Sequence, residues 1–256
     1  MKPCPETFPY PLMTLEQTES TSQYLTQLCN NDQKSVAEFT TVTAEFQTAG
    51  KGQRGNSWES EEGKNLLFSL VLYPTFLEAR RQFVLSQVVS LAIKEELSRW
   101  SNEITIKWPN DIYWQDRKIC GILIENDLCG HTISRSISGI GININQEVFR
   151  SDAPNPVSLK QITGKEHDRQ EILANVLRRI QIYYNGLQLE DFDTYSDEIA
   201  TRYARSLYRR RGYHPYEDAG GRFLARLLRV EQDGRFVLED ESGKEREYLF
   251  KEVQFK

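Results

Sequence analysis

A glycine-rich, basic segment from Gly50 to Trp58, with the sequence GKGQRGNSW, most limits the folds open to this chain. Its three glycines let the backbone approach a ligand closely, while Lys51 and Arg54 add positive charge, a combination typical of an anion-binding loop. As a bare pattern the segment reads G-x-G-x-x-G, the fingerprint of a dinucleotide-binding unit. That unit needs a strand before the loop and a helix that begins within it.

The sequence contains the strand but not the helix. Alternating apolar residues predict a strand over 41–46, and an apolar run predicts another over 66–73. The residues between Gly55 and the second strand are polar and show no apolar recurrence at helical spacing. A P-loop fails too, because Asn56 stands where that motif has lysine. The loop is therefore predicted to join two strands, either as an anion-binding loop or, alternatively, as a flexible surface loop.

Composition excludes several classes of protein. The 256 residues hold 32 Lys and Arg against 37 Asp and Glu, a net charge of −5, so general affinity for nucleic acid is not expected. No apolar stretch reaches 18 residues, and the first residues lack the apolar core of a signal peptide. The four cysteines are scattered without a C-x-x-C pair. We therefore expect a soluble cytoplasmic protein with free thiols, one large domain and at most a small appendage.

The arrangement of predicted elements indicates an α+β fold. Apolar residues at helical spacing predict helices over 20–29, 77–100 and 169–187. Asp168 and Glu171 form a capping-box-like start to the third helix. Strands are predicted over 104–108, 118–125 and 132–145. Because these strands follow one another between helices rather than alternating with them, the fold is α+β.

Composition changes near residue 205. Three consecutive arginines at 209–211 are followed by the pair Gly220-Gly221 and by short strand-like runs over 222–230, 235–239 and 245–255. Asp233-Gly234 and Ser242-Gly243 supply turns between these runs. The chain is thus predicted to divide into a domain over 1–205 and a small β-barrel over 206–256.

A second unusual segment runs from Lys107 to Ile112, with the sequence KWPNDI. A proline breaks the end of a strand, with a cation before it and an Asn-Asp pair after it. The segment is either part of a ligand site or a proline turn in which Asn and Asp serve turn geometry.

A third segment, from Lys118 to Glu125, reads KICGILIE. Period-two alternation places Lys118 on the face of Cys120 and opposite Gly121. The lysine begins an otherwise apolar strand, so its ammonium is held at a pocket edge or, alternatively, extends along the surface to solvent. Gly121 within a strand indicates close approach of a ligand or of other backbone.

The fourth segment, from Gly139 to Asn145, reads GIGININ. Its three isoleucines form one buried face. Its other face carries Gly139, Gly141 and then two asparagines, which suits a floor for a flat ligand, or alternatively a solvent-facing strand. With no catalytic triad and no metal-ligand spacing around the three histidines, no protein metal site is expected. Cations and backbone amides indicate phosphoryl or nucleotidyl chemistry.

These four segments, in this order, resemble the signatures of the biotin–protein ligase (biotin–[acetyl-CoA-carboxylase] ligase) family. The residues at 19–22 and 46–50 also fit, so the resemblance covers about residues 10 to 150. It implies a mixed-sheet catalytic domain like those of class II aminoacyl-tRNA synthetases and biotin–lipoate ligases, followed by an SH3-like barrel.

The resemblance also implies an activity. Biotin and ATP, with Mg²⁺, would form biotinyl-5′-AMP and pyrophosphate. A lysine of the biotin carboxyl carrier domain of acetyl-CoA carboxylase, or of a related biotin-dependent carboxylase, would then receive the biotin. The family includes repressors with an N-terminal helix-turn-helix, which this chain is expected to lack. No specific nucleic acid and no membrane are expected as partners, and the chain is expected to be a monomer or weak homodimer.

Residue roles follow from the resemblance. It implies that Lys118 holds the biotin carboxylate and later the phosphate oxygens. Lys118, Asp111 and Arg54 are the expected catalytic residues, Asp111 by orienting or deprotonating the acceptor ammonium. The expected biotin-binding residues are Ser20, Thr21, Ser22, Gln47, Gly50, Lys51, Gly52, Gln53, Lys118, Gly121 and Gly139. The expected nucleotide-binding residues are Lys51, Arg54, Trp58, Asn110 and Asn143. Trp58 would stack on the adenine or wall it off.

The glycine loop departs from the family pattern, since Lys51, Gln53 and Asn56 stand where arginines are common, and lysine lacks the bidentate fork of arginine. Two other functions compete with this interpretation. A lipoate–protein ligase would share the fold, although the KWPND segment and the barrel argue against it. A non-catalytic nucleic-acid-binding protein would use the eight arginines between Arg202 and Arg229, although the whole chain is acidic.

Overall fold

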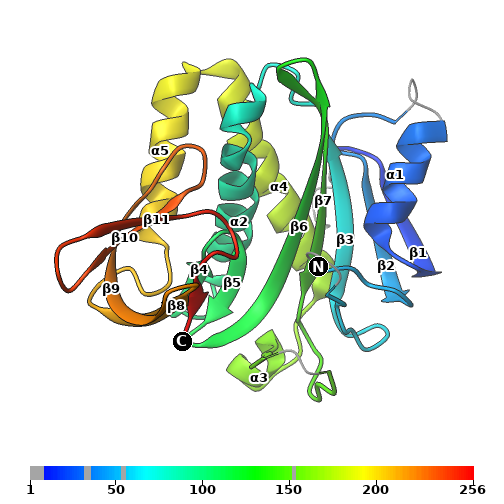
Figure 1. Cartoon of the computed structure of the whole chain (residues 1–256). Helices are drawn as coiled ribbons and strands as arrows, with labels where there is room; N and C mark the ends of the chain where they lie inside the picture. The colour runs from blue at the N-terminus through cyan, green and yellow to red at the C-terminus, as the bar shows by residue number, and fades with distance from the viewer. Residues whose placement is uncertain (1–8, 32–35, 53–55, 152–153) are drawn as a thin grey trace.

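A computed structural model describes residues 9–31, 36–52, 56–151 and 154–256. A large mixed sheet and a smaller antiparallel sheet form the framework (Figure 1). The large sheet contains β1 (Leu12–Thr18), β2 (Thr41–Gln47), β3 (Leu66–Leu72), β4 (Ile104–Lys107), β5 (Asp111–Trp114), β6 (Arg117–Cys129) and β7 (Thr132–Ile142). The helices are α1 (Thr21–Asn31), η2 (Ala79–Arg81), α2 (Phe83–Leu97), α3 (Leu159–Thr163), α4 (Arg169–Leu189) and α5 (Phe192–Arg205). The small sheet contains β8 (His214–Asp218), β9 (Gly221–Val230), β10 (Phe236–Asp240), β11 (Glu245–Tyr248) and β12 (Gln254–Phe255).

The strand order of the large sheet is β1-β2-β3-β7-β6-β5-β4. β1 and β2 are parallel, and every other neighbouring pair is antiparallel. The α+β prediction is confirmed. The five strands β3, β7, β6, β5 and β4 pair antiparallel, so the sheet is not built from repeated parallel β-α-β units.

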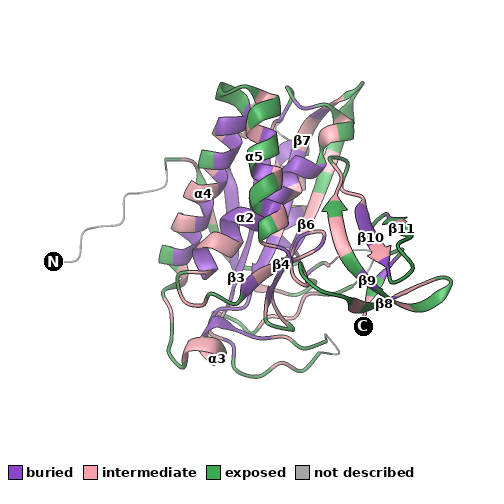
Figure 2. Ribbon diagram, turned by 90° about the vertical axis from the view of Figure 1, so that its left-hand side faces the viewer, coloured by how far each residue is buried: buried purple, intermediate pink, exposed green. Residues whose placement is uncertain are grey.

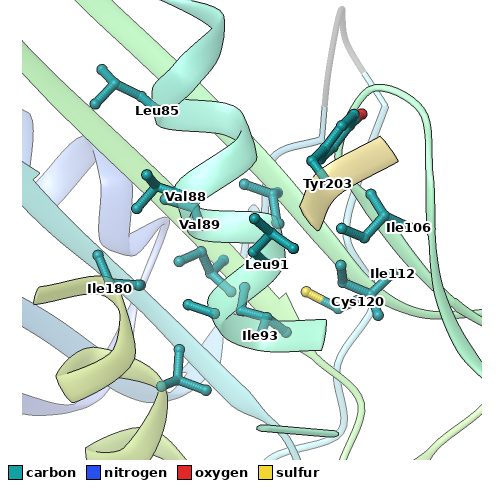
Figure 3. Packing of buried hydrophobic residues seen from close by; sticks show 14 of the residues in the cluster. Leu85, Val88, Val89, Leu91, Ile93, Ile106, Ile112, Cys120, Ile180 and Tyr203 are labelled. Atoms are coloured by element: carbon teal, nitrogen blue, oxygen red, sulfur yellow. The ribbon is translucent and has the colours of Figure 1, made fainter. Parts of the chain in front are cut away.

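Helices α2, α4 and α5 pack together on one face of the sheet and bury its apolar residues (Figures 1 and 3). The even residues of β3, among them Phe68 and Leu70, join this core, as do Ile140 and Ile142 of β7. On the opposite face, α1 contacts β2, β3 and β7 over part of the sheet. The rest of that face carries Ser69, Gly139 and Gly141, so the polar and glycine positions gather beside α1.

The predicted helices are largely confirmed. α1 and α4 match the predictions over 20–29 and 169–187, and the Asp168 carboxylate accepts from the backbone N–H groups of Gln170 and Glu171. The prediction that a helix begins at Leu77 is wrong, because Ala79 donates its N–H to the His131 carbonyl at the tip of the β6–β7 hairpin. That segment therefore forms only the short η2, and α2 begins at Phe83.

The strand predictions hold in place but not in length. β4 ends at Lys107 and β7 at Ile142, each earlier than predicted, while β6 continues to Cys129. β1, β5, β8, α3 and α5 were not predicted. Only Ser196, Ile199 and Tyr203 are buried along α5, so its apolar stripe is too thin to register as a helical pattern.

The C-terminal sheet has the order β11-β10-β9-β8-β12 and is antiparallel throughout, consistent with an SH3-like fold. It packs beside the end of the large sheet that holds β4 and β5 (Figures 1 and 2). The Trp108 indole stacks on Phe236 at 4.9 Å and donates Nε1–H to the Gly234 carbonyl at 2.9 Å. Within the described ranges, no helix is both long and apolar enough to span a bilayer.

Candidate ligand-binding site

A cavity of about 800 Å³ lies on the sheet face beside α1. This volume falls within the usual range for small-molecule sites, roughly 300–1,000 Å³. All four segments singled out in the sequence contribute to its walls, and so does the N-terminal end of α1. The turn between β11 and β12 adds Phe250 and Lys251. Ser20 and Lys251, which are 231 positions apart in sequence, thus meet at one site.

One end of the cavity is a network of buried hydroxyls. The Ser20 and Ser22 hydroxyls are 3.0 Å apart. Gln47 Oε1 accepts from Thr21 N–H at 2.7 Å and from its hydroxyl at 3.1 Å, and the same hydroxyl lies 2.8 Å from Ser69 Oγ. Ser69 was not predicted. The signal for it was a single serine in the apolar run LLFSLVL.

The floor of the cavity is the glycine surface of β6 and β7. Gly121 and Gly141 lie directly opposite each other in the antiparallel pair, and Gly139 pairs with Ser69 of β3. A β-carbon added at Gly139 would lie 3.4 Å from that of Ser22. The predicted smooth face is therefore present, with the hydroxyl network at one end.

The Trp58 indole itself lies on this floor. A β-carbon built on Gly141 would come within 2.4 Å of Trp58 Cε2, and one on Gly121 within 2.7 Å of Cζ3. Real β-carbons do not approach so closely, so only glycine at these positions permits the ring to sit there. The indole N–H is buried and has no hydrogen-bond partner among the described residues. A flat ring on the glycines was expected, but in this structure it belongs to the protein.

The opposite end carries an ion pair. Lys118 Nζ lies 2.7 Å from Asp111 Oδ2 and 5.8 Å from the Trp58 ring. The prediction that Lys118 shares a face with Cys120 is wrong. Cys120 pairs with Ile112 while Lys118 pairs with the next residue, Tyr113, so a bulge in β6 turns Lys118 to the side of Gly121.

A second cation, Lys107, lies at the same end and was not proposed as a site residue. Its ammonium donates to the Tyr113 hydroxyl at 3.2 Å and lies 4.8 Å from the Tyr113 ring and 5.0 Å from the Phe255 ring. Burial lowers the pKa of Lys107. Nearby Asp111 opposes that shift, while Lys118 and Arg209 add to it.

The Asn-Asp turn and the end of β7 supply amides. The Trp108–Pro109 peptide is cis, and the Pro109 carbonyl accepts from the Tyr203 hydroxyl at 2.6 Å. The same turn lines the cavity, so the two interpretations of this segment, a proline turn and part of a ligand site, both hold. Asn110 is buried in the wall. Asn143 donates to the Val157 carbonyl, but its Oδ1 is buried without a partner in the described part of the chain. Such an atom needs a ligand or water.

Asn145 does not belong to the cavity. Its side chain donates to the His167 carbonyl and accepts from the His167 N–H, both at 3.0 Å. These two hydrogen bonds tie the segment after β7 to the residues just before α4. The amide-bearing face predicted for the fourth segment therefore lines the cavity at Asn143, whereas Asn145 has a structural role.

The two described ends of the glycine loop pair with each other as an antiparallel bridge between Lys51 and Ser57. Trp58 donates to the Gly50 carbonyl at 2.9 Å, and Gly52 donates to the Asn56 carbonyl at 2.6 Å. Lys51 is exposed and lines the cavity. Two predicted site residues, Gln53 and Arg54, lie outside the described residues.

Comparisons with known proteins agree on one family. A profile of the Biotin/lipoate A/B protein ligase family matches residues 14–143. The bifunctional ligase/repressor BirA of Bacillus spizizenii is 30% identical over 238 residues, covering 88% of this chain and 68% of that protein. A biotin–[acetyl-CoA-carboxylase] ligase of Paracoccus denitrificans is 34% identical over 139 residues, covering 52% and 57% of the two chains.

A solved structure matches nearly the whole fold. The biotin protein ligase of Aquifex aeolicus, in complex with biotin and ATP, aligns with a TM-score of 0.78 at 28% identity. The alignment covers 96% of this chain and 98% of the Aquifex chain, so it includes both sheets.

Proposed function

Because the chain belongs to the Biotin/lipoate A/B protein ligase family, we propose that this ligase activates biotin with ATP and transfers it to a protein lysine. The observation that carries the proposal is the single cavity with hydroxyls at one end, a glycine floor, and the Lys118–Asp111 pair at the other end. That order suits a ligand with a polar ring and a carboxylate tail. A relative solved with biotin and ATP supports both substrates.

In the first step a biotin carboxylate oxygen attacks the α-phosphorus of ATP. The bond from that phosphorus to the bridging oxygen breaks, and pyrophosphate leaves with the electron pair, which gives biotinyl-5′-AMP. Two anions must meet for this to happen, so Lys118, Lys51 and Arg54 offset their repulsion. Trp58, Asn110 and Asn143 would contact the nucleotide.

In the second step the neutral amine of an acceptor lysine attacks the carbonyl carbon of the mixed anhydride. AMP leaves with the electron pair of the broken C–O bond, and an amide forms. The incoming lysine arrives as an ammonium and loses two protons in all. Asp111 would orient it and accept the first, and solvent would take the second as the amide forms.

Mg²⁺ enters this scheme with ATP. Among the described residues no group of three His, Cys, Asp or Glu side chains is arranged to hold a metal ion. Magnesium commonly binds substrate phosphates and keeps several waters, so it suits a site of this kind as part of the MgATP substrate.

The partner is proposed to be a biotin carboxyl carrier domain of acetyl-CoA carboxylase or of a related carboxylase, as the name of the Paracoccus relative suggests. We propose a catalytic domain over 1–205 and an SH3-like domain over 206–256. The chain would act as a monomer or weak homodimer in the cytoplasm, without a specific nucleic acid.

The test is to incubate the protein with MgATP and biotin and to look for bound biotinyl-5′-AMP by mass spectrometry. Biotin-dependent ATP–pyrophosphate exchange should appear in parallel. Lipoate in place of biotin is the matched control, because the family includes lipoate ligases. Exchange with lipoate but not with biotin would overturn the proposal in favour of lipoate ligation.

A further inference from the structure

Lys107 is the second cation at the charged end of the cavity, and its surroundings distinguish it from Lys118. Lys118 is neutralised by Asp111 at 2.7 Å. Among the described residues, no carboxylate forms an ion pair within 4 Å of Lys107. Its contacts are instead a phenol hydroxyl and two ring faces, from Tyr113 and Phe255.

A half-buried ammonium without an acidic partner is costly unless an anion completes its surroundings. Asp111 and two further cations, Lys118 and Arg209, lie close enough to influence Lys107 electrostatically. The Arg209 guanidinium already donates hydrogen bonds to the carbonyls of Pro215 and Lys256. Asp111 lies across from Lys107 in the β4–β5 pair, but its carboxylate is bonded to Lys118, so one carboxylate faces two lysines. Lys51 and Lys251 also line the cavity, and a multiply charged anion would balance this excess of positive charge.

The position of Lys107 in the sheet indicates which part of a nucleotide it meets. The hydroxyl network and the floor lie over β3, β7 and β6; Lys118 is on β6, Asp111 on β5 and Lys107 on β4. The site thus runs in one direction across neighbouring strands, spaced roughly 4.8 Å apart. In an in-line displacement the leaving oxygen lies opposite the attacking one. If the carboxylate approaches from the β7 side, pyrophosphate leaves toward β4.

We propose that Lys107 binds the β- and γ-phosphates of ATP and then the pyrophosphate formed, while Tyr113 and Phe255 act as positioning residues for its ammonium. This inference rests on the proposed function. It also gives the small sheet a part in the site, because Phe255 of β12 supplies one of the two ring faces.

The experiment compares Lys107→Gln, Lys107→Arg and wild-type protein, with Lys244→Gln as the matched control. Lys244 is exposed in the turn between β10 and β11, outside the cavity, and its replacement removes the same charge. The readouts are KM for ATP, KM for biotin, inhibition by pyrophosphate, and calorimetric binding of inorganic pyrophosphate with Mg²⁺ to the protein alone.

For Lys107→Gln we expect the KM for ATP and the dissociation constant of pyrophosphate to rise about tenfold or more, as for loss of a hydrogen bond to a charged group. The KM for biotin should stay within about twofold, since biotin would lie over β3, β7 and β6. Lys107→Arg should recover most of the pyrophosphate affinity because it keeps the charge. Tyr113→Phe and Phe255→Leu should give smaller rises in the same two constants, without a change for biotin.

Two results would overturn the inference. One is pyrophosphate affinity in Lys107→Gln equal to that of Lys244→Gln. The other is an equal loss of biotin and pyrophosphate binding, with no recovery in Lys107→Arg, which would assign Lys107 to structure. Failure of the proposed function would look different, because wild-type protein would then form no biotinyl-5′-AMP, whereas calorimetry would still report whether Lys107 binds pyrophosphate.

Discussion

The ammonium of Lys118 lies 2.7 Å from the Asp111 carboxylate, across neighbouring strands β6 and β5. The two side chains are 29% and 31% exposed, so the pair is open to the cavity rather than sealed in the core. A substrate carboxylate would therefore have to share Lys118 with Asp111. The pair itself is close to neutral until an anion enters, and it holds an acid beside the position where an ammonium would arrive.

Lys118→Ala is expected to slow formation of biotinyl-5′-AMP about 100-fold or more, because one of the charges that offsets repulsion between carboxylate and phosphate is lost. Stability should change little, since a pair this exposed contributes roughly 0–1 kcal/mol to the free energy of unfolding. Biotin-dependent pyrophosphate exchange and thermal unfolding measure the two effects. Near-normal exchange in a folded Lys118→Ala protein would remove the assigned role.

Asp111→Asn is expected to separate the two half-reactions. The amide oxygen can still accept a hydrogen bond from Lys118, so adenylate formation should fall less than about tenfold, whereas transfer should fall about 100-fold because the amide cannot take a proton. Single-turnover transfer from preformed biotinyl-5′-AMP to a carrier domain isolates the second step. An equal slowing of both steps would show that Asp111 serves only to hold Lys118.

The sequence predicted most of the sheet because its strands carry strong local patterns. Ile140, Ile142 and Ile144 alternate with glycine and asparagine, and that alternation fixes which face is buried. β5 escaped prediction because it has only four residues and follows closely on a proline. α5 escaped because its burial depends on contacts with α2 and α4 rather than on a broad apolar stripe of its own.

The residues of the site were harder to predict than its position. The bulge that turns Lys118 toward Gly121 depends on pairing with β5, which alternation along one strand does not reveal. Lys107 is set apart by Phe255, a contact across 148 positions that no local motif announces. Ser69 lies in no recognised motif, and its only signal in the sequence is that it is a single polar residue within an apolar strand.

Gly141→Ala tests whether Trp58 occupies the glycine floor in the ligand-free protein. The added methyl would lie 2.4 Å from Trp58 Cε2, so the indole must move away. We expect the free energy of unfolding to fall by about 1–3 kcal/mol, the usual cost of overpacking. Most of that loss should vanish in a Trp58→Ala background, where nothing lies on the floor. The four proteins form a double-mutant cycle measured by urea unfolding.

Biotin affinity is the second measurement made on the four proteins of this cycle. The methyl would remain on the floor in both backgrounds, so Gly141→Ala should weaken biotin binding with or without Trp58. A stability cost that persists in full without Trp58 would mean that the methyl collides with the sheet itself. The position of the Trp58 indole over the floor would then not explain why residue 141 is a glycine.

Trp108→Phe tests the contact between the two sheets. The indole donates Nε1–H to the Gly234 carbonyl and stacks on Phe236. Phenylalanine keeps the stacking but not the hydrogen bond, so the free energy of unfolding should fall by about 1 kcal/mol. Phe236→Leu is the matched variant that keeps the hydrogen bond and removes the stacking. A Trp108→Phe protein as stable as wild type would show that water replaces the bond.

The acid stability of the small sheet is expected to depend on Asp240. Its carboxylate accepts from the Ser242 N–H and hydroxyl, the Lys244 N–H and Arg246 Nε, at 2.5–3.1 Å. The hydrogen bonds from Ser242 and Arg246 hold the pKa of Asp240 well below its usual value.

A folded-state pKa below the unfolded value stabilises the protein above the unfolded pKa, about 3.9 for aspartate, and this stabilisation is lost as the pH falls toward the folded pKa. Asp240→Asn removes the titrating group, so the variant should be less stable than wild type at pH 7. The difference in unfolding midpoint between wild type and Asp240→Asn should then narrow steadily below about pH 4. Glu241→Gln is the control and should follow the wild-type curve, because Glu241 is an exposed neighbour without such bonds to any described residue. A gap between wild type and Asp240→Asn that stays constant from pH 7 to pH 3 would mean that Asp240 acts through the shape of the turn and not through its charge.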